Sequence, residues 1–332
     1  MVTEKKQRRK ITRRWYLLLF ILIASVVGCF SLFYDDGSVS SFIDNEGEQE
    51  FMEAYYEAMS YLPEPAEEVL LTTSFGQVKL YKFQASETER TPLLLLPGKS
   101  ASTPMWEANL QDLIQERPVY TIDLIGEPGL SVENVRIQTI QDQATWLKEV
   151  VTSLDEAEIH LLGLSFGGWS AVNLLVQEEV PQVKSLILVE PVYVFDTIPL
   201  KMVLASIPAS VPFIPKSIRD RMLSYISGGA EVEDEPIARL IETGMRSFKS
   251  KLPMPQKISK EELESLTVPT LAILGGKSTM HNPDKAFAAA EANLTHPQSE
   301  VVLFDGASHA INGEYPKELA DHIQMFLTRL KP

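Results

Sequence analysis

The sequence of 332 residues predicts an α/β fold with a doubly wound, mostly parallel sheet that helices cover on both faces. Three observations support this prediction. Short β-rich apolar runs alternate with stretches of helical periodicity along most of the chain. The apolar content of 45% over this length is enough for one large core. A glycine-flanked serine, Ser165, lies where an apolar run passes directly into a helical pattern, as at a sharp strand-to-helix turn.

The first 34 residues predict a membrane anchor. Residues 1–14 carry seven basic residues against one glutamate, and Trp15–Tyr34 is a run of twenty uncharged residues, long enough to cross a bilayer as one transmembrane helix. The positive-inside rule keeps the basic tail in the cytoplasm and places residues 35–332 on the other side of the cell membrane. We therefore expect a single-pass protein with an extracytoplasmic domain.

A lipoprotein signal is the alternative interpretation of this segment. Residues 26–29, Val-Val-Gly-Cys, resemble a bacterial lipobox, and processing after residue 28 would leave the lipid on Cys29, the only cysteine of the chain. Against it, the sequence stays apolar as far as Tyr34, where a processed lipoprotein usually turns polar at once. Ordinary secretion is a third interpretation, and all three place the domain outside the cytoplasm.

Acidic residues dominate the segment that follows. Eleven acidic residues and no Lys or Arg lie between Asp35 and Glu68, so we expect residues 35–62 to form a solvated acidic stalk that ends in a short helix over Phe51–Met59. The net charge of −15 argues against nucleic acid as a partner. A single cysteine excludes an internal disulfide, and the five histidines show no metal-ligand spacing, so no metal site is predicted.

Residues 63–332 predict the α/β domain. Val69–Thr73 and Val78–Phe83 flank a Gly-containing turn and predict an antiparallel hairpin. The parallel strands are expected at Leu93–Leu96, Val119–Ile122, Ile159–Leu162, Leu186–Val189, Leu271–Leu274 and Val301–Phe304. The crossover helices are expected at Trp106–Gln115, Ile140–Leu154, Trp169–Glu178, Ala286–Ala292 and Glu318–Leu330.

The alternation breaks from about residue 192 to about residue 266. This interval predicts helices around Leu200–Ala205, Ile218–Ile226 and Pro236–Phe248, separated by prolines. An insertion after a strand end, at the edge of the sheet where ligands bind, predicts a helical cap over Ser165. Its apolar side chains either line a substrate pocket or pack the cap onto the core. They are Met202, Leu204, Val211, Phe213, Ile214 and Met222.

Ser165 has the surroundings of a nucleophile. Gly163 and Gly167 remove the side chains that would obstruct a tight turn, and the turn leaves the backbone N–H of Phe166 at a helix N-terminus, where an oxyanion would sit. A serine hydroxyl needs a base, and His309 is the candidate because it follows the last predicted strand at the same edge of the sheet. The three other histidines considered for this role need no function beyond a structural or surface one. They are His160, His281 and His322.

These motifs resemble those of the α/β-hydrolase superfamily, particularly its carboxylesterase-like bacterial members, over roughly residues 63–332. Asp123–Ser131 is similar to the DxxGxGxS segment of that family, and Gly306 to His309 matches its late Gly-x-x-His. The resemblance implies hydrolysis through an acyl-enzyme without a cofactor. The aspartate nucleophile of haloalkane dehalogenases and epoxide hydrolases is replaced by Ser165, which disfavours those reactions.

Two departures from the family pattern bear on the site. Pro97-Gly98-Lys99-Ser100 stands in place of the usual His-Gly, but the backbone N–H of Lys99 can still be the second oxyanion donor.

The second departure concerns the acid of the triad. Ser278 stands where the family usually carries its triad carboxylate, so either the acid has moved or the site is weakened. Glu190, at the tip of the preceding strand, is the favoured acid. Asp284, Asp196 or no acid are the alternatives.

The sequence therefore predicts a membrane-anchored extracytoplasmic serine hydrolase, a carboxylesterase that acts on a small-molecule ester with an apolar acyl or alcohol group. Its expected catalytic residues are Ser165, His309 and Glu190. The alternative is a hydrolase-fold binding or signalling protein whose catalysis is weakened or lost with the usual acid.

Overall fold

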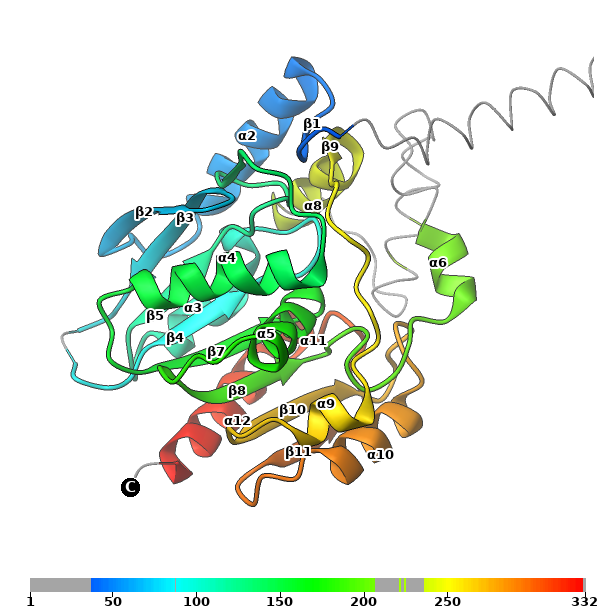
Figure 1. Ribbon diagram of the computed structural model, residues 1–332. Coiled ribbons are helices and arrows are strands. Elements are labelled where there is room, and N and C mark those ends of the chain that lie inside the picture. Colours follow the sequence, from blue (N-terminus) through cyan, green and yellow to red (C-terminus); the bar gives the residue numbers. More distant parts are fainter. Residues whose placement is uncertain (1–36, 87, 207–220, 222–223, 225–235, 331–332) are drawn as a thin grey trace, which may run out of the picture. The chain divides into compact units, whose positions relative to one another are not determined.

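The computed structural model describes residues 37–86, 88–206, 221, 224 and 236–330, and its centre is a nine-stranded sheet (Figure 1). The order across the sheet is β11-β10-β8-β7-β4-β5-β3-β2, and β6 pairs with β3. The strands are β2 (Glu67–Thr73), β3 (Gly76–Phe83), β4 (Leu93–Leu96), β5 (Val119–Ile122), β6 (Val132–Glu133), β7 (Ile159–Leu164), β8 (Val183–Val189), β10 (Thr270–Gly275) and β11 (Glu300–Phe304).

The sheet has the predicted mixture of directions. Six strands run parallel to one another, in the spatial order β5, β4, β7, β8, β10 and β11. The strands β2 and β3 form an antiparallel hairpin at one edge. The strands β4, β5 and β7 are buried along their whole length, because helices cover both faces of a parallel sheet. The chain order reverses between β4 and β7, so the carboxyl ends of these two strands form the crevice where α/β sheets bind ligands.

Helices cover both faces of the sheet, and each face has its own apolar core (Figure 1). The core on one face includes side chains of α4, α5, α9 and α10, and the core on the other includes side chains of η1, α3, α11 and α12. These helices are η1 (Thr103–Trp106), α3 (Glu107–Leu113), α4 (Ile140–Ser153), α5 (Phe166–Gln177), α9 (Lys260–Glu264), α10 (Pro283–Asn293), α11 (Ile311–Glu314) and α12 (Pro316–Arg329). The predicted doubly wound α/β fold is therefore confirmed.

The acidic segment before the sheet differs from the stalk that the sequence predicts. From residue 39 onward it packs on the domain, as β1 (Ser41–Phe42) and the 15-residue helix α2 (Asn45–Met59). Asp44 caps α2 by accepting the Gly47 N–H at 2.8 Å. Phe51 and Tyr55 of α2 are fully buried, whereas four of the five glutamates of this helix are exposed.

The described parts of the insertion contain the expected short helices, together with one short strand and irregular segments. The regular elements are α6 (Leu200–Ser206), α8 (Pro236–Ser247), β9 (Phe248–Lys249) and, at the end of the insertion, α9. The strand β9 pairs antiparallel with β1, and α8 packs against α2 around the fully buried Leu240. The insertion and the N-terminal segment thus support each other. The predicted helix at 218–226 and the positions 211, 213, 214 and 222 lie outside the described residues, and so does the side chain of Leu204.

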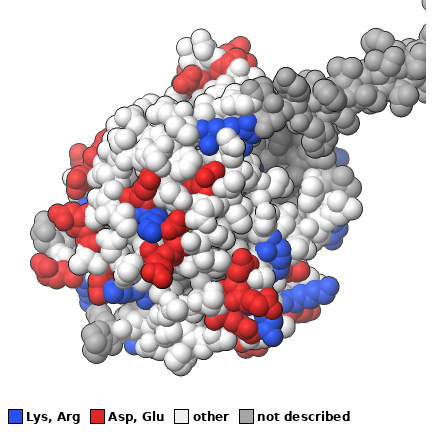
Figure 2. Space-filling view, viewed as in Figure 1, with Lys and Arg blue, Asp and Glu red and all other residues white. Residues whose placement is uncertain are grey.

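Within the described ranges, no helix combines the length and the apolar character needed to cross a membrane. The predicted anchor Trp15–Tyr34, the basic tail and Cys29 lie outside those ranges. Figure 2 shows the acidic character at the surface: Asp and Glu side chains cluster in several places on this face, with Lys and Arg scattered among them.

Candidate active site

Ser165 lies on a strained turn between β7 and α5. Its backbone has φ 53° and ψ −114°, a conformation that a residue with a side chain rarely adopts. The two flanking glycines make the turn possible. A Cβ on Gly163 would lie 2.3 Å from the Gly167 carbonyl oxygen, and a Cβ on Gly167 would lie 2.1 Å from that of Leu96. The serine is therefore held at the carboxyl edge of the sheet by backbone packing that only glycine permits.

His309 lies within hydrogen-bond distance of this serine. It follows β11, and its Nε2 is 2.9 Å from Ser165 Oγ. The preceding residue, Ser308, fixes the loop because both its N–H and its hydroxyl donate to the Glu314 carboxylate at 2.7 Å. The imidazole side chain is 12% exposed, so it is open to a small molecule from one side only.

Glu190 contacts the other nitrogen of the His309 imidazole. Its Oε2 lies 2.9 Å from His309 Nδ1, and its Oε1 accepts the backbone N–H of Gly275 at 2.6 Å. The residue directly follows β8, and its φ of 48° turns the chain at the strand end. The carboxylate is fully buried. Glu190, and not a residue after β10, is thus the carboxylate that contacts the imidazole.

A second histidine, for which the sequence predicts no catalytic role, lies close to the same carboxylate. His281 Nε2 lies 3.3 Å from Glu190 Oε1, a close approach but not a well-formed hydrogen bond. Burial alone would raise the pKa of Glu190, yet the contacts with His281 and His309 outweigh it and lower the pKa to about 2. Glu190 is therefore a carboxylate at all ordinary pH values.

The other positions considered for the acid lie elsewhere. Ser278 closes a tight turn in the loop after β10, where its N–H donates to the Gly275 carbonyl oxygen at 3.1 Å. Asp284 is exposed on the first turn of α10, and Asp196 accepts the Asn282 N–H at 3.0 Å. In the described part of the chain, none of them forms a hydrogen bond or an ion pair with His309.

The two predicted oxyanion donors flank the serine. Phe166 is the first residue of α5, where helix geometry leaves the backbone N–H without an intrahelical partner. Lys99 follows Gly98, and a Cβ on Gly98 would lie 3.6 Å from Ser165 Cβ, so this loop passes beside the serine. Among the residues that the structure describes, neither the Phe166 N–H nor the Lys99 N–H has a hydrogen-bond partner. Both N–H groups are free to receive an anionic oxygen.

This arrangement has the chemistry of an activated hydroxyl. The imidazole can accept the serine proton through Nε2, because Nδ1 already contacts an ionised carboxylate that stabilises the resulting cation. Two backbone N–H groups adjoin the same hydroxyl. Together they form a site that suits acyl transfer.

Several known proteins are similar to this chain. Residues 93–322 match the alpha/beta hydrolase family. The chain is similar to carboxylesterase YbfK of Bacillus subtilis (strain 168), with 27% identity over 289 residues that cover 83% of this chain and 93% of that protein. It is also similar to the uncharacterized carboxylesterase nap of the same strain, with 25% identity, covering 83% of this chain and 91% of that protein.

Solved structures show the same likeness. The crystal structure of carboxylesterase CesB (YbfK) from Bacillus subtilis superposes with a TM-score of 0.76 at 25% identity, over 85% of this chain and 98% of that one. The naproxen esterase (carboxylesterase NP) of Bacillus subtilis superposes with a TM-score of 0.77 at 23% identity, over 85% and 99%. At its lower identity, the second comparison supports the fold alone.

Proposed function

The chain belongs to the alpha/beta hydrolase family, and from this premise we propose that it is a carboxylesterase that works through an acyl-enzyme on Ser165. One observation carries the proposal. A continuous series of contacts runs from Ser165 Oγ through both nitrogens of His309 to Glu190, with 2.9 Å at each of its two steps. A site that had lost its acid would lack the second step. The missing carboxylate at Ser278 therefore does not count against catalysis.

The reaction follows from the roles of these groups. Ser165 Oγ attacks the ester carbonyl carbon while His309 Nε2 takes the hydroxyl proton, and the Glu190 carboxylate stabilises the imidazolium. The N–H groups of Phe166 and Lys99 hold the negative oxygen of the tetrahedral intermediate. Its collapse expels the alcohol, which receives the proton from His309. Water, deprotonated by the same histidine, then attacks the acyl carbon. The second tetrahedral intermediate breaks its bond to Ser165 Oγ, which takes the proton back from His309, and the carboxylic acid is released.

An ester of a carboxylic acid is the substrate class that the relatives favour, since YbfK and nap are both named carboxylesterases. An apolar acyl or alcohol group is consistent with the apolar composition of the insertion, where Met202 is among the buried side chains. The insertion would then act as a cap that shields the acyl-enzyme from bulk water.

Hydrolysis of a p-nitrophenyl ester series, from acetate to dodecanoate, tests the activity. The full chain is purified in a mild detergent beside a Ser165→Ala variant, which keeps the turn and removes only the hydroxyl. We expect turnover by the wild type and none above the uncatalysed rate by the variant. Equal rates for the two proteins, or no turnover of any ester, would instead favour a hydrolase-fold binding protein.

We also propose that residues 15–34 anchor the enzyme in the cell membrane with the catalytic domain outside the cytoplasm, the alternative being a lipid on Cys29. The support is the uncharged twenty-residue run behind a basic tail. Membrane fractionation of cells that carry Cys29→Ser separates the two anchors. Unchanged membrane retention and size indicate the helix, whereas release or altered processing indicates lipidation. A wild-type protein found only in the soluble fraction would exclude both.

A further inference from the structure

We propose that Glu127 is a positioning residue for the oxyanion hole: its buried carboxylate fixes the loop that presents the Lys99 N–H to the substrate. The inference rests on the proposed function, because it assumes that Ser165 forms a tetrahedral adduct whose oxygen Lys99 receives. It assigns a role to a glutamate that lies in the DxxGxGxS-like segment and is not part of the triad.

The contacts of Glu127 converge on two consecutive residues of that loop. Its Oε2 accepts the backbone N–H of Ser100 at 2.8 Å, and its Oε1 accepts a proton of Lys99 Nζ at 2.9 Å. Ser250, from the insertion, donates its hydroxyl to Oε1 at 3.1 Å. The Glu127 side chain is 1% exposed. A buried carboxylate needs such partners, and here they include both the backbone and the side chain of the oxyanion loop.

The loop needs an external support because its own conformation is unfavourable. Ser100 has φ 58°, in the left-handed region that serine seldom occupies. The turn itself is closed by a long hydrogen bond of 3.3 Å, from the Ala101 N–H to the Gly98 carbonyl oxygen. Glu127 accepts the N–H of the Lys99–Ser100 peptide, and the Lys99 N–H belongs to the adjacent Gly98–Lys99 peptide. Rotation of the Lys99–Ser100 peptide would redirect the Lys99 N–H, and the hydrogen bond to the carboxylate opposes that rotation.

The Lys99 side chain also lies close to Phe166, the residue that carries the other proposed oxyanion N–H. Its Nζ lies 5.6 Å from the ring centroid of Phe166, within the range of a cation–π contact. The ammonium group thus touches the Glu127 carboxylate on one side and the side chain of the second oxyanion residue on the other. In this chain the Glu127–Lys99 pair takes over the support of a loop that lacks the usual histidine before Gly98.

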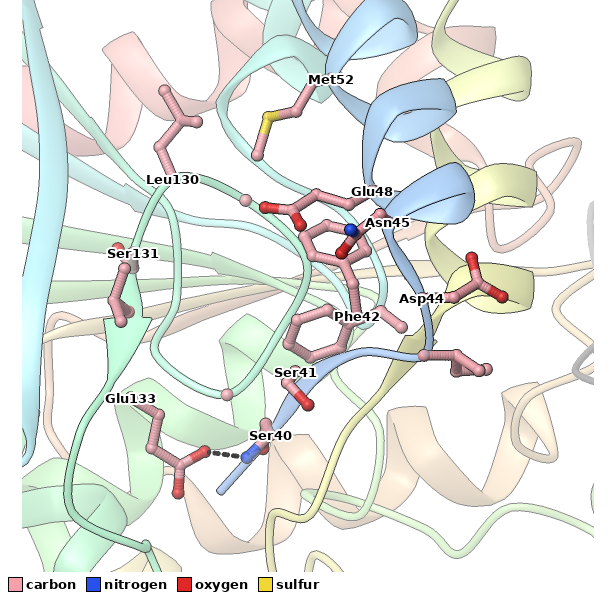
Figure 3. A pocket seen from close by; sticks show the side chains of 15 residues that line it. Ser40, Ser41, Phe42, Asp44, Asn45, Glu48, Met52, Leu130, Ser131 and Glu133 are labelled. Carbon is pink, nitrogen blue, oxygen red and sulfur yellow. Dashed lines mark hydrogen bonds between the residues drawn. The ribbon is translucent and has the colours of Figure 1, made fainter. Parts of the chain in front are cut away.

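Glu133 provides a matched control for a test of Glu127. It lies two residues after that segment, is 5% exposed, and accepts two backbone N–H groups, from Ser40 at 2.9 Å and Ile137 at 2.8 Å. Figure 3 shows its bond to Ser40 at the end of a pocket of about 470 Å³, whose lining includes neither Ser165 nor Lys99. Glu127→Gln and Glu133→Gln therefore make the same chemical change at two buried carboxylates, only one of which contacts the oxyanion loop.

The test compares these two variants with the wild type in the full chain. It measures kcat and KM for the preferred p-nitrophenyl ester, and the inhibition constant of a trifluoromethyl ketone with the same acyl chain. Such a ketone forms a tetrahedral adduct with the serine and so reports oxyanion binding. For Glu127→Gln we expect kcat to fall about 10- to 100-fold, below the cost of deleting a donor outright, with KM within about twofold. Ketone affinity should fall in parallel, and Glu133→Gln should change neither.

A second variant keeps the proposal testable if Glu127→Gln folds poorly. Lys99→Met retains the backbone N–H and the apolar stem but removes the ammonium group. We expect a smaller fall in kcat and ketone affinity, and a double variant whose loss is less than the product of the two single losses, because both act on one loop.

Three results would decide against the inference or its premise. A Glu127→Gln protein that matches Glu133→Gln in kcat and ketone affinity would overturn it. The inference would also be overturned if Glu127→Gln lost activity only because fewer of its molecules have a titratable serine, with normal turnover for each titrated site. A wild type that neither hydrolyses esters nor binds the ketone would refute the proposed function itself, which is a distinguishable outcome.

Discussion

Glu190 holds both of its carboxylate oxygens in defined contacts, one with His309 and one with Gly275 and His281. The strand β8 ends at Val189, so the carboxylate lies at the same sheet edge as Ser165. From the end of β8, the longer side chain of a glutamate reaches His309, whereas the family usually has an acid after the strand that corresponds to β10. The proposed activity at Ser165 therefore depends on this carboxylate acting as the triad acid.

Glu190→Gln should lower kcat about 10³- to 10⁴-fold, because a neutral amide cannot stabilise the imidazolium and favours the wrong tautomer of His309. The matched control is Ser278→Ala, at the position where the family usually has its acid, and we expect it to keep kcat within about threefold. Steady-state kinetics on one ester compares the two. If Ser278→Ala loses more activity than Glu190→Gln, the assignment of the acid is wrong.

Glu190 should also stay ionised down to strongly acidic pH. Its pKa of about 2 lies below the ordinary 4.5, so the stability it contributes is complete above pH 4.5 and is lost as the pH falls toward 2. Any fall in kcat/KM between pH 4 and 8 must then come from another group. Carbon-13 NMR of the Glu190 carboxyl, assigned with Glu190→Gln, measures this directly.

We expect a titration midpoint near 2 in the wild type and a higher one in His281→Ala, which removes one of the partners that lower the pKa. A wild-type midpoint near 4.5 would contradict the description of the site.

Ser165 and His309 could be predicted from local sequence because each lies in a short motif next to a strand. Glu190 could be proposed only from the family resemblance, since some members carry the acid one strand earlier, and its contact with the imidazole depends on how β8 and β10 pair. The contact with His281 could not be predicted. The loop after β10 brings that histidine to the carboxylate, and nothing in its neighbouring residues signals this.

Helix α2 is the element that the sequence describes least well. Its glutamates suggest a solvated stalk, but they face Arg239 and Arg246 of α8, which are remote in sequence, and these pairs are partly or largely exposed. Exposed ion pairs contribute about 0–1 kcal/mol each, so burial of the apolar face is the main source of its stability. The pattern of Phe51, Tyr55 and Ala58 does predict a buried stripe, but only the structure identifies the helix that covers it.

Phe51→Ala should therefore destabilise the domain by about 3–5 kcal/mol, the usual cost of truncating a fully buried aromatic ring. Tyr56→Ala, on the same helix but 60% exposed, should cost less than about 0.5 kcal/mol. Urea unfolding of a fragment of residues 37–332 measures both. A small loss for Phe51→Ala, similar to that of Tyr56→Ala, would mean that α2 is dispensable, as a stalk would be.

For the whole molecule, the alternation of strands and helices was sufficient to predict the sheet, because five of the six parallel strands are largely buried apolar runs and the edge strand β11 is partly buried. The unit that carries this sheet begins at Val39 and not at residue 63. The pairing of β1 with β9 explains the difference, since two-residue strands leave no periodic signal in the sequence.

The stability of the domain should fall in mild acid because of His160. Burial, and secondarily the charge of Arg117, lower the pKa of this histidine to about 4. The unfolded chain takes up a proton near pH 6.5 and the folded chain only near 4, so stability is lost as the pH falls between these values, by about 3 kcal/mol. Urea unfolding at pH 7 and pH 4 should show that loss in the wild type, and a smaller one in His160→Asn. An equal loss in both proteins would assign it to other groups.

The activation of Ser165 by Glu190 through His309 can be measured as the rate at which a fluorophosphonate labels the full chain, with the modified residue identified by mass spectrometry. We expect labelling of the wild type at Ser165 alone, no labelling of Ser165→Ala, and labelling of Glu190→Gln slowed by at least about 100-fold. Labelling at another residue, no labelling of the wild type, or equal rates for the wild type and Glu190→Gln would contradict it.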